Sequence, residues 1–161
     1  MIRHVSIPAR DPRHVATVLA ELMQGRAYPF PGPVAGAFMA ASADAHGTNI
    51  EVYPETAAAT PGEGGEEGFF VANPAPPQYW PFHLLLSVQL DEAQVQAIGD
   101  REGWRTRRFG RGGPPGRPLF DVIEFWVENR FLVEVSTPDM DPAYLRTCEG
   151  LEAMMARMAP A

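Results

Sequence analysis

The first part of the chain changes from an alternating pattern of apolar and polar residues to a helical pattern. Residues 2–8 alternate, although imperfectly, and this pattern is typical of a half-buried strand. Asp11 and Pro12 then provide a helix cap and a first helical residue, and Gly25 is placed to end the helix. Between them, apolar residues recur at the spacing of one helix face: Val15, Val18, Leu19 and Leu22. The chain is therefore predicted to begin with a strand and a helix.

Three short strands are predicted next. Apolar segments separated by proline, glycine and aspartate turns indicate strands over residues 28–30, 37–42 and 48–53. The first module, residues 1–53, thus has the order β, α, β, β, β.

The same order returns in residues 82–137. A strand is predicted over residues 82–89, and a helix begins after its cap, Asp91, and ends at Gly103. Three strands follow, over residues 104–109, 120–127 and 131–136. This internal repeat predicts an α+β fold in which two βαβββ modules form a curved, mixed β-sheet cleft within a single domain.

The segments outside the two modules differ in character. Residues 54–81 are rich in Pro, Gly, Ala and Glu, and they are predicted to be a linker. Residues 138–161 are predicted to contain a helix that begins at Asp141 and Pro142. Its apolar face consists of Tyr144, Cys148, Leu151, Met155 and Met158. That face must be buried against either the domain's own sheet or a partner subunit. We expect a homodimer.

Charge and composition exclude several classes of protein. The net charge of −7 disfavours nucleic acid as a partner, and the arginine-rich residues 101–117 are interpreted as a solvated or substrate-facing strand. No apolar run approaches the ~18 residues of a membrane span, and the first residues lack the core of a signal peptide. We therefore expect a cytoplasmic protein without a membrane partner. All 13 basic residues are arginine, so Schiff-base catalysis and a P-loop, which require lysine, are excluded.

One histidine and one glutamate occupy matching places in each module. His4 and His83 lie near the start of the first strand, and Glu51 and Glu134 lie inside the last strand. The separations are alike, because 51 − 4 = 47 and 134 − 83 = 51. A carboxylate among the apolar residues of a strand requires a cation or strong hydrogen-bond donors. These four residues are the candidate site.

A divalent metal ion is the compensation that we expect at this site. Two imidazoles and two carboxylates suit borderline or hard ions, and the pattern does not choose among Ni, Co, Zn, Mn, Fe and Mg. The alternative is a metal-free network in which His and Glu pair directly.

The pattern resembles the vicinal oxygen chelate superfamily, which includes glyoxalase I, methylmalonyl-CoA epimerase, extradiol dioxygenases and bleomycin resistance proteins. Residues 4–12 are similar to its opening strand and helix cap, and residues 46–51 are similar to its strand ending in glutamate. The resemblance covers residues 2–137 apart from the linker. It implies a glyoxalase I-like metal site whose ligands are His4, Glu51, His83 and Glu134.

Four further residues are candidates for substrate binding: Phe38, Tyr53, Arg107 and Phe125. A two-residue turn at residues 129–130 would place Phe125 opposite Glu134, whereas a slip of one residue would place Glu124 and Trp126 on that face. The aromatic residues are equally consistent with core packing, and the arginines with a solvated edge strand.

The resemblance implies a lyase, isomerase or epimerase that acts on a small substrate with vicinal oxygens. The metal would stabilise an enediolate while Glu51 or Glu134 acts as general base. Two alternatives remain: an extradiol-type dioxygenase, and a metal-free binding protein of the drug-sequestering, bleomycin-resistance kind.

Overall fold

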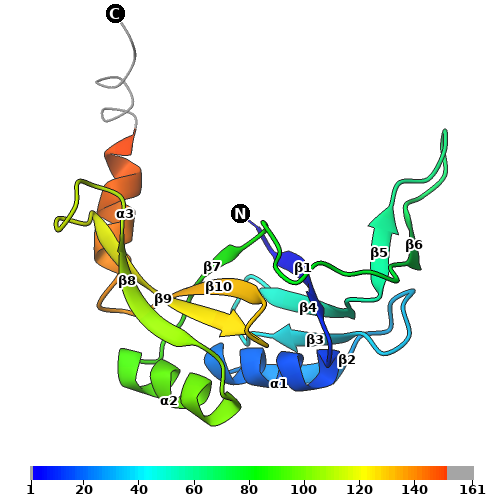
Figure 1. The fold of residues 1–161 in the computed structure, drawn as a ribbon, viewed down its shortest axis with the longest axis horizontal. Helices are drawn as coiled ribbons and strands as arrows, with labels where there is room; N and C mark the ends of the chain where they lie inside the picture. The colour runs from blue at the N-terminus through cyan, green and yellow to red at the C-terminus, as the bar shows by residue number, and fades with distance from the viewer. Residues whose placement is uncertain (1, 152–161) are drawn as a thin grey trace, which may run out of the picture. The chain divides into compact units, whose positions relative to one another are not determined.

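The computed structural model describes residues 2–151 and divides the chain into two compact units (Figure 1). Unit 1 comprises Met1–Pro81 and unit 2 comprises Phe82–Ala161. Each unit contains one four-stranded mixed sheet with its own helix, which is the repeat that the sequence predicts.

Unit 1 contains the predicted β, α, β, β, β order. Its elements are β1 (His4–Ala9), α1 (Pro12–Leu22), β2 (Arg26–Pro29), β3 (Phe38–Ala41) and β4 (Asn49–Pro54). The strand order is β1-β4-β3-β2, with β1 parallel to β4 and the other pairs antiparallel. The Asp11 carboxylate accepts a hydrogen bond from the His14 backbone N–H at 3.0 Å, so the predicted cap is confirmed.

The core of unit 1 lies between α1 and one face of its sheet. Val15 and Leu19 of α1 and Val52 of β4 are fully buried there. Gly25 follows the helix because a Cβ at this position would lie 1.9 Å from the carbonyl oxygen of Ala41. Side chains alternate along β4, so Glu51 points to the opposite face, away from α1.

The predicted linker contains a β-hairpin that the sequence pattern did not indicate. Strand β5 (Ala57–Thr60) pairs antiparallel with β6 (Phe69–Ala72). Alanine-rich segments have weak strand propensity, and an isolated two-stranded hairpin is marginally stable. Here the ring of Phe70 stacks on that of Tyr53 at a centroid distance of 4.8 Å, which attaches the hairpin to unit 1.

Unit 2 repeats the architecture of unit 1. Its elements are β7 (Leu84–Ser87), α2 (Glu92–Glu102), β8 (Thr106–Arg111), β9 (Phe120–Val127), β10 (Phe131–Ser136) and α3 (Asp141–Glu149). The strand order is β7-β10-β9-β8, again with the first pair parallel. Asp91 and Gln94 form a capping box, and Gly103 ends α2 in the left-handed conformation at φ 66°.

The predicted register of the last hairpin is wrong by one residue. Glu134 lies opposite Glu124, not Phe125, because the turn has three residues, 128–130, instead of two. Asn129 stabilises this longer turn at φ 56°: its side chain accepts a hydrogen bond from the Arg105 N–H and donates one to the Gly103 carbonyl. Phe125 therefore faces the core, where it is fully buried against Trp104.

The C-terminal helix is confirmed for the described residues. Helix α3 begins at Asp141, whose carboxylate accepts hydrogen bonds from the hydroxyls of Ser87 and Ser136. Two residues of the predicted apolar face, Met155 and Met158, lie outside the described residues. Within residues 2–151, no helix is long and apolar enough to cross a membrane.

Candidate functional site

Glu51 is the centre of a polar cluster on the open face of the unit 1 sheet. Its carboxylate is 14% exposed, and its Oε2 accepts hydrogen bonds from the Ser6 hydroxyl at 2.9 Å and from the Tyr53 hydroxyl at 3.3 Å. The other oxygen, Oε1, lies 3.9 Å from His4 Nε2. Strand pairing produces this arrangement, because Ser6 of β1 lies directly beside Glu51 of β4.

Tyr53 has a strongly perturbed acidity in this cluster. Burial, together with the charge of Glu51 and the hydrogen bond to it, raises the pKa of Tyr53 to about 12. The phenol therefore remains a hydrogen-bond donor to Glu51 into the alkaline range, above its ordinary pKa of 10.0. Of the predicted substrate-binding residues, Tyr53 is the one that lies beside a predicted ligand.

The open face of unit 1 also contains an unsatisfied acceptor. Asn49 Oδ1 is buried and has no hydrogen-bond partner, and Asn49 lies beside His4 in the strand register. Buried polar atoms of this kind usually have a partner. An imidazole nitrogen, a carboxylate oxygen and an amide oxygen on one face form a donor set that fits a divalent cation. In unit 1, therefore, the residues present fit the metal that the resemblance implies.

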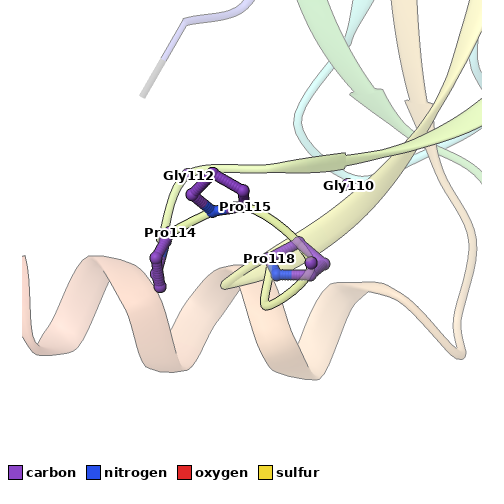
Figure 2. A pocket seen from close by; sticks show the side chains of 7 residues that line it. Gly110, Gly112, Pro114, Pro115 and Pro118 are labelled. Carbon is purple, nitrogen blue, oxygen red and sulfur yellow. The ribbon is translucent and has the colours of Figure 1, made fainter.

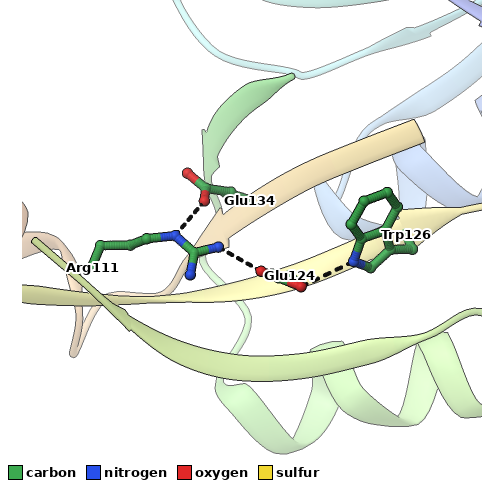
Figure 3. A network of polar contacts seen from close by, with 4 residues as sticks. All are labelled: Arg111, Glu124, Trp126 and Glu134. Carbon is green, nitrogen blue, oxygen red and sulfur yellow. Dashed lines mark hydrogen bonds and ion pairs between the residues drawn. The ribbon is translucent and has the colours of Figure 1, made fainter. Parts of the chain in front are cut away.

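The predicted ligand in unit 2 has a different environment. Glu134 Oε1 accepts a hydrogen bond from Arg111 Nε at 2.7 Å, and Arg111 Nη2 donates to Glu124 Oε1, also at 2.7 Å. The Trp126 indole N–H donates to Glu124 Oε2 at 3.0 Å. Figure 3 shows these four side chains as one connected network. A guanidinium thus faces Oε1 of Glu134, and its positive charge opposes a divalent ion at this carboxylate, so this environment does not fit a metal ligand.

The four predicted ligands divide between the two units. His4 and Glu51 belong to unit 1, and Glu134 and the exposed His83 belong to unit 2. Among the described residues of either unit, no group of three or more His, Cys, Asp or Glu side chains forms a metal-binding cluster.

Of the remaining substrate-binding candidates, Phe38 and Phe125 lie away from the glutamates and Arg107 lies beside Glu124. Phe38 pairs with Val52 and so lies on the face opposite Glu51, while Phe125 is in the core of unit 2. Arg107 is exposed and lies opposite Glu124, with its guanidinium 6.0 Å from the centroid of the Phe109 ring. Phe38 and Phe125 are thus placed for packing, because strand alternation turns them away from the polar faces.

Sequence reasoning missed three residues of these clusters: Ser6, Asn49 and Arg111. Ser6 is two residues after His4, so strand alternation places both on one face. Arg111 was missed because β8 was predicted to end at residue 109, whereas it continues to Arg111. Glu124 was an alternative that depended on the hairpin register.

A pocket of about 410 Å³ also occurs in unit 2, in the loop between β8 and β9 (Figure 2). Its lining consists entirely of glycine and proline, including Pro114, Pro115 and Pro118. It offers no side chain with acid, base or ligand chemistry, so it is not the candidate site.

The known proteins that resemble this chain do so distantly. No family model and no curated protein sequence matches this chain. A solved glyoxylase/bleomycin resistance protein/dioxygenase domain from Frankia sp. EAN1pec is 15% identical with a TM-score of 0.48, covering 84% of this chain and 94% of that one. An integron cassette protein from the mobile metagenome of V. cholerae is 16% identical with a TM-score of 0.47, covering 86% and 94%.

These likenesses concern the fold alone. The chain's own strand orders, β1-β4-β3-β2 and β7-β10-β9-β8, are the repeated βαβββ arrangement that the sequence predicted. The α+β class and the repeated βαβββ modules expected from the sequence are therefore confirmed within each unit.

Proposed function

We propose that this protein is a glyoxalase-type, metal-dependent lyase or isomerase that acts on a small substrate with vicinal oxygens. One observation supports the proposal above the others. Glu51 presents one fixed oxygen and one available oxygen, beside His4 and an unpartnered Asn49 Oδ1. Such a donor set is typical of a cation site and is not required for the stability of a sheet.

Each residue of unit 1 has a definite task in this proposal. His4, Glu51 and Asn49 would hold the ion. A bound divalent ion stabilises negative charge that develops on a substrate oxygen. Ser6 and Tyr53 hold Oε2 of Glu51, so that Oε1 alone is free to bind or to accept a proton. The raised pKa of Tyr53 keeps this hydrogen bond intact into the alkaline range.

Metal content tests the proposal directly. Protein without an affinity tag is incubated with Ni, Co, Zn, Mn, Fe or Mg, and bound metal is measured by mass spectrometry. We expect near-stoichiometric metal in the wild type and its loss in Glu51→Gln and His4→Ala. Glu55→Gln is the matched control, because Glu55 is a nearby carboxylate of unit 1 that pairs with Arg10 instead. A wild-type protein that retains none of these ions would contradict the proposal.

A metal-free small-molecule binding protein is the second candidate. It is supported by the observation that protein groups already compensate Glu134, through Arg111, and Glu51, through two hydroxyls. For a ligand found by screening, an affinity that a chelator leaves unchanged would favour this candidate. Oxygen consumption with a catechol and bound iron would instead favour a dioxygenase.

A further inference from the structure

Two carboxylates lie directly opposite each other on the face of the unit 2 sheet that also carries Phe120, against which Tyr144 of α3 packs. Glu124 of β9 and Glu134 of β10 are register partners, and their side chains are 18% and 14% exposed. Like charges directly opposite on a sheet are destabilising, and partial burial increases the cost. The pair therefore requires a cation.

Arg111 supplies that cation from the neighbouring strand. Its Nε and Nη2 each lie 2.7 Å from one carboxylate, distances typical of charge-assisted hydrogen bonds. Although burial opposes the charge, the hydrogen bonds to Glu124 and Glu134 raise the pKa of Arg111. The backbone is anchored too, because the Arg111 carbonyl accepts a hydrogen bond from the Leu119 N–H at 2.9 Å.

We infer that Arg111 is a built-in cation for the Glu124–Glu134 pair, and that Glu134 holds this guanidinium in place of a metal ion. The arrangement is visible in Figure 3, where Arg111 lies between the two carboxylates. A guanidinium cannot lose its proton in a protein, so a divalent ion on Glu134 would face a permanent positive charge. The inference rests on the proposed function only in assigning the metal ion to the residues of unit 1.

The two modules of the repeat therefore differ in the cation that meets their glutamates. The two modules have the same strand order, but an exchangeable metal ion would bind only to the first module. In unit 2 the positive charge is the guanidinium of Arg111, whose side chain extends from β8 across β9 to Glu134.

Calorimetric titration with Mn²⁺ and Co²⁺ tests the inference. We expect Glu134→Gln to bind metal as the wild type does. Arg111→Met leaves two carboxylates without their cation and is expected to gain a metal site, which Glu134→Gln then abolishes in the double variant. Arg108→Met is the matched control, because Arg108 also bridges two carboxylates, Glu92 and Asp121, but at an exposed position. It is expected to gain no site.

Loss of wild-type metal in Glu134→Gln would overturn the inference, as would an Arg111→Met variant that is folded but gains no site. If Arg111→Met does not fold alone, its circular dichroism is measured with added Mn²⁺ or Co²⁺. Refolding by either ion supports the inference because binding to the native state stabilises it, and failure of both overturns it.

The two proposals fail in different ways. A wild type without metal contradicts the proposed function, yet a metal site gained by Arg111→Met and removed by Glu134→Gln would still support the built-in cation. Conversely, metal bound through both Glu51 and Glu134 would support the metalloenzyme and overturn the built-in cation.

Discussion

Glu51 and Glu134 occupy equivalent positions in the two modules, yet different groups compensate their charges. Two hydroxyls hold one oxygen of Glu51, whereas Arg111 forms a charged hydrogen bond with Glu134. A carboxylate held by neutral donors keeps its full negative charge available to a cation. A carboxylate paired with a guanidinium does not, and the two glutamates are therefore chemically unequal.

The pKa of Tyr53 leads to a prediction for alkaline pH. Its folded-state value of about 12 lies above its ordinary value of 10.0, so the folded protein holds the phenolic proton more tightly than the unfolded chain does. This contribution to stability is complete below the unfolded pKa and is lost as pH rises from there through about 12. We expect the free energy of unfolding to fall more steeply across this range in the wild type than in Tyr53→Phe.

Urea unfolding at successive pH values measures this difference. The absorbance of tyrosinate in the folded protein provides a second measurement, because Tyr53→Phe should lose a phenol that ionises at about pH 12. Equal pH slopes for the two proteins would contradict the prediction.

At the scale of elements, turns decided where the sequence prediction succeeded or failed. Strands β9 and β10 have the ends that were predicted, Phe120–Val127 and Phe131–Ser136. Their pairing was nevertheless wrong by one residue, because turn length depends on contacts that Asn129 makes with the distant segment between α2 and β8. Local hydrophobic patterns locate strands, but they carry little information about such contacts.

Asn129 allows a test of this explanation. Asn129→Ala removes the two side-chain hydrogen bonds to the backbone of Arg105 and Gly103. It also places alanine, which is strained at positive φ, at φ 56°. We expect a loss of about 1–3 kcal/mol in the free energy of unfolding. Urea denaturation measures it.

Asn129→Gly is the matched control, since glycine adopts positive φ without strain and lacks only the hydrogen bonds. It should lose less stability than Asn129→Ala. An alanine variant as stable as the wild type would show that another contact sets the turn.

At the scale of the whole molecule, the described part of α3 has an exposed apolar surface. Leu145 is 57% exposed, and Leu151, just after the helix, is 47% exposed. None of the residues of Asp141–Glu149 is buried, although Tyr144 contacts the ring of Phe120. We propose that a second copy of the chain covers Leu145 and Leu151. Only Leu151 of these two belongs to the apolar face that the sequence predicted, and Tyr144 of that face packs on Phe120 of the chain's own sheet.

Sedimentation velocity tests the proposed dimer. We expect a dimer for the wild type, and we expect Leu145→Glu to shift it towards the monomer because a carboxylate in an apolar interface is costly. Glu149→Lys, a charge change on the same helix, is the control and should remain dimeric. A monomeric wild type at all concentrations would contradict the proposal.

The sequence by itself determined the features that depend on neighbouring residues: the caps at Asp11 and Asp91, the strand and helix periods, and the repeat that aligns Glu51 with Glu134. Only the tertiary structure decided which cation or donor meets each glutamate. Arg111 reaches Glu134 across an intervening strand, over a sequence separation of 23 residues, through a register that a three-residue turn sets. Because side-chain pairing across a sheet changes completely with a shift of one residue, no local pattern encodes it.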